Sequence, residues 1–414
     1  MKVTSLLLSA FLFAAIPCAL LADELHDYLA EAALNNPGLE ASFNRWKAAL
    51  EKIPQVKALP DPRFSYTYFI QEVETRVGPQ QQKFGIAQTF PWFGKLKLKG
   101  DAAAEAAEAA RQNYEQAQLE LFYRVKAAYF EAYVLGRSIE LTRQHLLLMQ
   151  NIERVARTRY QAGSAPQSAL IQAQVELGKL EDRFQTLEAL RKPVAAKLNA
   201  ALNRPAGTAL PLPIEFTPRP VSFTDEEITQ KLQADSPALK RLDALIRKED
   251  AGAKLARKNR YPDVTFGLET IQTGDALMPT PDDGKDPVMA MVSVNLPIWF
   301  GKLKAAEQEA AYRRAAAEGE RLDRGNTLGA ALQMTLYRFH DAERKINLYR
   351  DTLVPKAEQS MKVAQQGFED GRVSFISLVD AERLLLEFQL AADQALGDRE
   401  VRIAEIEILT GEIQ

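Results

Sequence analysis

Residues 90–97 read FPWFGKLK, and residues 296–304 repeat this stretch as LPIWFGKLK, with one residue inserted after the proline. The shared WFGKLK is too long an identity to arise by chance. Before each proline, apolar residues alternate with polar or small ones, as in a strand. After each copy the chain is rich in Ala, Glu, Gln, Leu and Arg, which favour helix. The stretch therefore predicts a strand-to-helix junction that occurs twice.

The junction belongs to an internal repeat of about 200 residues. Pro60–Asp61 recurs as Pro262–Asp263, and residues 36–39 recur as residues 236–239. We divide the chain into a first repeat at 23–203, a proline-rich linker at 204–224 and a second repeat at 225–414. Each repeat predicts a helix, two short strands, a very long helix, a tight turn and a returning helix.

Residues 1–22 have the composition of a signal peptide, with Lys2 followed by an apolar run. The run is about half the ~20 residues that a membrane helix needs, so a retained anchor is disfavoured. Cleavage removes Cys18, the only cysteine. Lipidation of Cys18 is the alternative, although Ile16 and Pro17 fit a lipoprotein cleavage site poorly.

Residues 101–160 contain no proline and predict a helix of about 60 residues, about 90 Å long. Apolar residues recur three or four positions apart within it and again in residues 328–353. A helix of this length cannot enclose a compact core, so its apolar stripe must pack against other helices, as in a coiled coil. Pro355 predicts a bend or a new helix start in the second repeat.

Residues 64–71, 84–90, 264–271 and 288–296 predict four strands, each with one apolar face. Residues 74–83 and 273–287 predict water-exposed loops between them. Strands of this kind suit a membrane barrel, but four cannot close one, whereas three copies supply twelve. Soluble two-stranded hairpins are the alternative.

The composition argues against several classes of function. The net charge is −3 and no Lys/Arg run exists, so nucleic-acid binding is not expected. His26, His145 and His340 are the only histidines, which argues against a metal site. No phosphate-binding loop or Gly-x-Ser-x-Gly motif is present, so we expect no cofactor, no catalytic residues and no enzyme activity.

The repeat and its junctions resemble the TolC-like outer-membrane efflux family over essentially the whole mature chain. The resemblance implies a mainly helical fold, in which a trimer combines an α-barrel of long helical hairpins with a shared 12-stranded transmembrane β-barrel. The family's junction motif falls on Pro91, Gly94, Pro297 and Gly301. The two glycines are expected to absorb the change of backbone direction.

The resemblance also implies that the helical-hairpin tips form the periplasmic end of the channel and contact an adaptor protein. The residues it assigns to these tips are Arg159, Gly163, Ser168, Gly371 and Ser374. Asp380 matches a position where the family often narrows its pore with a ring of carboxylates. Ser377 stands where a second acidic residue is often found, so this chain departs from the double acidic ring of the family. An acid on a solvated helix face is the alternative for Asp380.

The resemblance implies a passive exit duct across outer membrane and periplasm for toxic small molecules or heavy-metal cations, in a tripartite efflux or type I secretion system. The implied partners are two further copies, outer-membrane lipid, a periplasmic adaptor and an inner-membrane pump of the resistance-nodulation-division type. The WFGK motif is similar to that of the CusC/CzcC-like heavy-metal branch of the family. The competing hypothesis is a periplasmic coiled-coil adaptor or scaffold without a membrane barrel.

Overall fold

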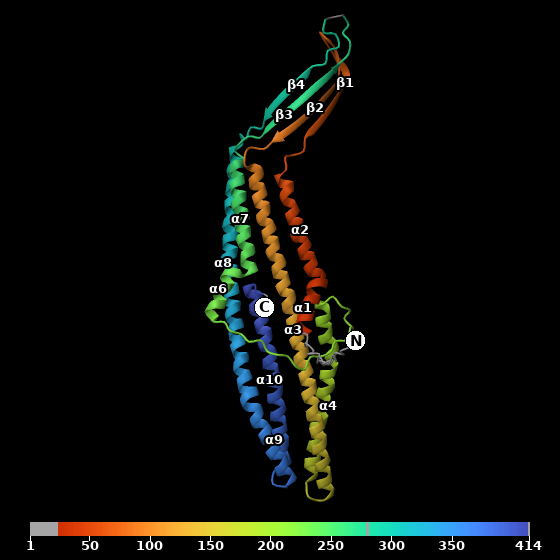
Figure 1. The fold of residues 1–414 in the computed structure, drawn as a ribbon, viewed down its shortest axis with the longest axis vertical. Coiled ribbons are helices and arrows are strands. Elements are labelled where there is room, and N and C mark those ends of the chain that lie inside the picture. Colours follow the sequence, from red (N-terminus) through yellow and green to blue (C-terminus); the bar gives the residue numbers. More distant parts are fainter. Residues whose placement is uncertain (1–23, 279–280, 413–414) are drawn as a thin grey trace, which may run out of the picture.

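The computed structural model describes residues 24–278 and 281–412, and it shows a long rod of helices with a β-sheet at one end (Figure 1). The predicted signal peptide and Cys18 lie outside the described residues. Both described ends of the chain lie near the middle of the rod, and the two helical tips lie at the end opposite the sheet (Figure 1).

The two halves of the chain contain corresponding elements in the same order. The first half comprises α1 (Glu24–Asn35), α2 (Pro37–Lys57), β1 (Arg63–Thr75), β2 (Gly78–Phe90), α3 (Lys95–Gln161), α4 (Gln167–Ala189) and α5 (Arg191–Ala201). The second comprises α6 (Asp225–Asp235), α7 (Pro237–Lys258), β3 (Val264–Thr273), β4 (Val288–Val294), α8 (Phe300–Leu348), the π-helical turn η1 (Tyr349–Leu353), α9 (Val354–Glu369) and α10 (Phe375–Thr410). Each half opens with two helices and not one, because Pro37 and Pro237 each start a new helix.

The long helix predicted in the first half is confirmed as α3, whose 67 residues span about 100 Å. Its buried stripe includes Leu119, Val125, Tyr129 and Tyr133. Apolar clusters follow one another along the rod: one joins α3 and α4 to α9 and α10 near the tips, and others lie near the middle. The core is therefore a seam between helices, as the apolar periodicity predicts.

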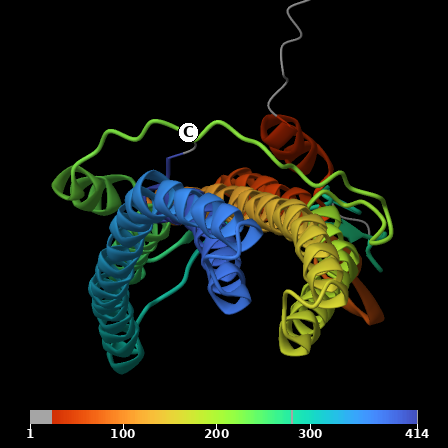
Figure 2. The ribbon, with the colours of Figure 1, turned by 90° about the horizontal axis from the view of Figure 1, so that it is seen from below.

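The helices form a curved layer (Figure 2). The extended segment between α5 and α6 runs across the convex side, where α1 and α6 also lie (Figure 2). The opposite side of the layer is concave. This curvature gives the rod one inner and one outer face.

The break predicted at Pro355 is confirmed. A π-helical turn at Tyr349–Leu353 separates α8 from α9, and Pro355 lies in the first turn of α9. Proline supplies no N–H, and a π turn is one way a helix accommodates such an interruption. The corresponding part of α3 continues without a break, so the two outgoing arms differ.

The four strands form one antiparallel sheet in the order β1-β2-β3-β4. The loop predicted at residues 74–83 is wrong, because β1 runs to Thr75 and β2 starts at Gly78, where φ is +121°. Backbone pairing on both sides holds the Gln-rich start of β2 in the sheet despite its composition. The long connection predicted between β3 and β4 is confirmed.

Candidate functional site

The sheet has one apolar face that is continuous over all four strands. Phe64 lies opposite Ile86, Ile86 opposite Leu268, and Leu268 opposite Ala290. Large side chains exposed on this face include Phe64, Tyr66, Tyr68, Ile86, Phe266, Leu268, Val292 and Val294. Water disfavours a contiguous apolar surface of this kind, whereas lipid covers it at no cost.

The opposite face of the sheet, called the polar face below, carries charged, hydroxyl and small side chains together with Ile271, Met289 and Met291. Lys83 of β2 lies 2.6 Å from Glu269 of β3, and the hydroxyls of Thr89 and Thr265 are 2.8 Å apart. Ser65 and Ser293 lie on the same side, since the side chains of a strand alternate. This polar face is suited to line a water-filled passage.

The sheet has two unpaired edges. Within the described part of the chain, β1 pairs only with β2, and β4 pairs only with β3. Unpaired backbone N–H and C=O groups cost several kcal/mol each in lipid, roughly, so a membrane sheet must be closed. A single copy does not close it.

The two strand-to-helix junctions differ at their glycines. Pro91 follows β2, and Gly94 caps α3 with φ +87°, a left-handed conformation that favours glycine. Pro297 follows β4, but Gly301 lies in the first turn of α8 without a positive φ. The expectation for Gly301 is therefore wrong. The second junction turns before the glycine, at the inserted Ile298: the Ile298 N–H donates to the Leu296 carbonyl at 2.9 Å, and the Phe300 N–H donates to the Ile298 carbonyl at 3.0 Å.

The predicted tip residues lie at the two turns farthest from the sheet. Gly163 follows α3 with φ +71°, and Gly371 follows α9 with φ +75°, so each ends its helix in a left-handed turn. Ser168 lies in the first turn of α4, and the Ser374 hydroxyl caps α10 by accepting the N–H of Ser377.

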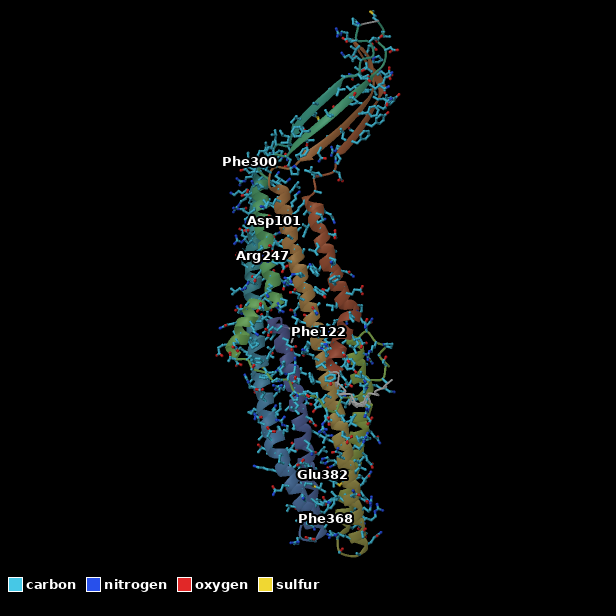
Figure 3. All side chains as sticks on the ribbon, in the orientation of Figure 1. Asp101, Phe122, Arg247, Phe300, Phe368 and Glu382 are labelled. Carbon is cyan, nitrogen blue, oxygen red and sulfur yellow. The ribbon has the colours of Figure 1, made fainter. Side chains whose placement is uncertain are left out.

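The two tips are in contact. The Arg159 guanidinium lies 4.8 Å from the Phe368 ring centre and donates a hydrogen bond to the backbone carbonyl of Glu369. Phe368 marks this end of the molecule in Figure 3. The sequence assigned Arg159 to a tip but did not indicate that it bridges them.

The proposed constriction residues lie on the first turns of α10. Ser377 faces the Ser374 hydroxyl at 2.9 Å. The Asp380 side chain is 59% exposed, with Arg383 at 3.7 Å as its charged neighbour. An acid that is this exposed is available to a passing cation, although the nearby arginine offsets part of its field.

Four polar contacts between α3 and α10, made by three buried residues of α3, were not predicted. His145 Nδ1 lies 2.7 Å from Glu382 Oε1, and the other ring nitrogen lies 2.9 Å from Gln389. Lys126 pairs with Glu407, and Tyr133 bonds Asp393 at 3.2 Å. Glu382 lies near the tip end of the rod (Figure 3). These contacts fix how the two halves align, because a shift would leave buried polar groups unpaired.

Glu176 and Glu400 are two of the carboxylates in the helical part whose pKa values are shifted. Burial opposes ionisation of Glu176, but hydrogen bonds from Arg383 and Lys179, at 3.0 Å and 2.9 Å, outweigh it and lower its pKa. Burial raises the pKa of Glu400, and Arg399 and Arg219 offset this only in part. Glu176 ties α4 to α10, so its charge supports contact between the two hairpins.

No group of three or more His, Cys, Asp or Glu side chains is placed to hold a metal ion in residues 24–278 and 281–412. None of the helices in these ranges combines the length and apolar character needed to span a membrane.

Comparison with known proteins gives one family. The sequence profile described as "Outer membrane efflux protein" matches residues 28–204 and 228–412. The cobalt-zinc-cadmium resistance protein CzcC of Cupriavidus metallidurans is 22% identical over 377 residues, covering 89% of this chain and 85% of its own length. Nodulation protein T of Rhizobium leguminosarum bv. trifolii is 18% identical and covers 94% and 85%.

Solved structures share the fold. The outer membrane protein VceC of Vibrio cholerae superimposes with a TM-score of 0.78 at 17% identity, covering 94% of this chain and 96% of VceC. CusC, whose structure is described in terms of transmembrane channel formation, gives 0.79 at 15% identity and covers 95% and 93%. At such identities the structural likeness shows the fold alone, and the family assignment rests on the match of the sequence profile.

Proposed function

Because this chain belongs to the outer membrane efflux protein family, we propose that three copies form the passive exit channel of a tripartite exporter. The chain is an efflux component of the outer membrane that extends into the periplasm, as its resemblance predicted. The trimer, its partners and its cargo are the new parts of the proposal.

The observation that carries the proposal is the sheet, with its apolar face, polar face and two unpaired edges. Three copies bring twelve strands, which leave room for a water-filled interior, whereas the eight of a dimer would be filled by side chains. The concave face of the helical layer then surrounds the axis, and the polar face of the sheet lines the passage.

The tips are proposed as the docking end for a periplasmic adaptor and, through it, an inner-membrane pump of the resistance-nodulation-division type. The tip residues concerned are Arg159, Gly163, Ser168, Gly371 and Ser374. Energy comes from the pump. The chain itself acts as a duct, which agrees with relatives named for resistance and export and not for catalysis.

We propose divalent heavy-metal cations as cargo, because the relative CzcC is named for cobalt, zinc and cadmium resistance and matches most of this chain. Deletion of the gene is expected to sensitise cells to these cations and not to dyes or antibiotics. The opposite sensitivity would replace this cargo with organic molecules and leave the channel assignment in place.

The assembly is tested by native mass spectrometry of protein extracted by detergent from the outer-membrane fraction. A trimer supports the shared barrel. A stable monomer in that fraction contradicts it, and a soluble periplasmic species favours the adaptor or scaffold hypothesis. The same mass reports whether the chain starts after residue 22 or carries lipid on Cys18.

A further inference from the structure

The first junction is held by an aspartate from the other half of the chain. Lys95, only 5% exposed, donates hydrogen bonds to Asp263 Oδ1 at 2.7 Å and to the Tyr261 carbonyl at 2.8 Å. The backbone N–H of Trp92 donates to the same Asp263 oxygen at 2.8 Å. Asp263 thus clamps the β2–α3 junction from the start of β3.

An aromatic contact accompanies the clamp. The Trp92 ring stacks on Tyr261, with ring centres 5.4 Å apart and planes inclined by 10°. Polar and apolar contacts therefore act together where β2 and β3 lie side by side.

The second junction has the corresponding lysine and tryptophan, but the aspartate that corresponds to Asp263 does not lie beside them. By the internal repeat, Lys302 corresponds to Lys95, and Asp61 corresponds to Asp263. Asp61 precedes β1 and Lys302 follows β4, so they lie at opposite edges of the sheet. Both side chains are exposed, and neither makes a hydrogen bond or ion pair with any described residue.

The neighbouring apolar residues are unpartnered in the same way. Trp299, the counterpart of Trp92, is 73% exposed, and Leu59, the counterpart of Tyr261, is 45% exposed. Phe300, beside Trp299, marks this junction in Figure 3. The β4 edge of the sheet thus presents a lysine and an exposed tryptophan, and the β1 edge presents an aspartate and an exposed leucine. The two edges are therefore complementary in charge and in apolar surface.

We propose that Asp61 of one copy clamps the Lys302 junction of its neighbour, as β4 of that neighbour pairs with β1. The partner is a second copy of this chain, and the inference rests on the proposed trimer. Lys302 starts from the first turn of α8 and not, like Lys95, from the first residue of its helix. The flexible lysine stem accommodates this difference.

The repeat also fixes the register of the joint. Gln88, three residues before its junction proline, lies opposite Phe266, three residues after its clamp aspartate. Val294 of β4 is three residues before Pro297, and Phe64 is three residues after Asp61. The same register therefore places Val294 opposite Phe64 of the next copy, and Val292 opposite Tyr66. All four belong to the apolar face, so the face continues across the joint. A slip by one residue would place apolar side chains among the polar ones.

The test uses paired cysteines in a chain carrying Cys18→Ser. Asp61→Cys with Lys302→Cys is treated with a short bis-maleimide in isolated outer membranes and is expected to give covalent dimers and trimers. The matched control combines Asp61→Cys with Lys304→Cys, which lies two residues further along α8 and points elsewhere. It is expected to remain monomeric on denaturing gels.

A charge exchange gives a second test that does not depend on a linker. Asp61→Lys and Lys302→Asp are each expected to lose trimer that resists detergent, and the double variant to recover it. Native trimers without cross-links or recovery would overturn the clamp and leave the proposed function standing. Absence of any trimer from the unmodified protein would overturn both.

Discussion

The guanidinium of Arg159 lies 4.8 Å from the Phe368 ring centre and so joins the end of α3 to the end of α9. It also donates to the carbonyl of Glu369. Arg159 is thus one of the links between the two hairpins, and it lies at the tips, which the proposed function places at the periplasmic end of the passage.

Arg159→Ala is expected to loosen the tips and raise the conductance of channels reconstituted in planar bilayers. The cation–π contact is partly exposed and contributes about 0.5–1 kcal/mol, so the shift should be a few-fold in open population. Arg157→Ala is the control, because Arg157 pairs with Glu153 of its own helix. Equal effects of both variants would contradict a bridging role.

Asp380→Asn is expected to reduce block by divalent cations, because three symmetric copies would concentrate negative potential near the tips. Glu387→Gln is the control, since it removes the same charge about two turns further from the tip on α10. Unchanged block and conductance in Asp380→Asn would leave the carboxylate as a solvated surface acid.

Acid should weaken the contact of Glu176 with Arg383. Since the folded-state pKa of Glu176 is lowered, this contact stabilises the fold above the ordinary glutamate pKa, and the stabilisation is lost as pH falls through the lowered value. Glu176→Gln is expected to cost about 1 kcal/mol at neutral pH, since Arg383 is half-exposed and screened, and to flatten the acid dependence.

Thermal unfolding at a series of pH values measures this, with Glu188→Gln as the control. Glu188 bonds Arg191 one turn away, and its contact with Arg143 of α3, at 3.8 Å, stays within its own hairpin. A Glu176→Gln variant that keeps the full acid dependence would show that another carboxylate is responsible.

The two junction glycines should respond oppositely to alanine. Gly94→Ala forces a left-handed conformation on a residue with a Cβ and should cost about 1–2 kcal/mol, although the added atom meets only Lys258 at 3.9 Å. Gly301→Ala should stabilise by up to about 1 kcal/mol, because a Cβ there meets nothing within 4 Å and alanine favours helix. Paired unfolding curves measure both, and equal shifts would contradict the difference between the junctions.

Local signals in the sequence predicted most of the architecture. The WFGKLK repeat located both junctions, three-to-four spacing identified the buried side of α3, and Pro355 marked a real break. The Gln-rich start of β2 was misread because its backbone pairing with β1 and β3 outweighs its loop-like composition.

The sequence did not predict the contacts between residues that are far apart in the chain. Lys126 and Glu407 are 281 residues apart in the chain, and periodicity shows which side of a helix is buried but not which residue lies across from it. His145 was considered only as a metal ligand, whereas it bonds Glu382. A charged residue within an apolar stripe is the one signal that would have suggested such pairs.

The open edges of the sheet have a consequence for biogenesis. The helical hairpins form from neighbouring parts of the chain and can fold early, whereas β2 must find β3 across nearly the length of one repeat. If the proposed trimer forms, a newly exported copy carries an apolar, edge-exposed sheet through water before it meets its neighbours. The longer a copy stays in that state, the more it needs a chaperone, because assembly and aggregation both use the unpaired edges of β1 and β4.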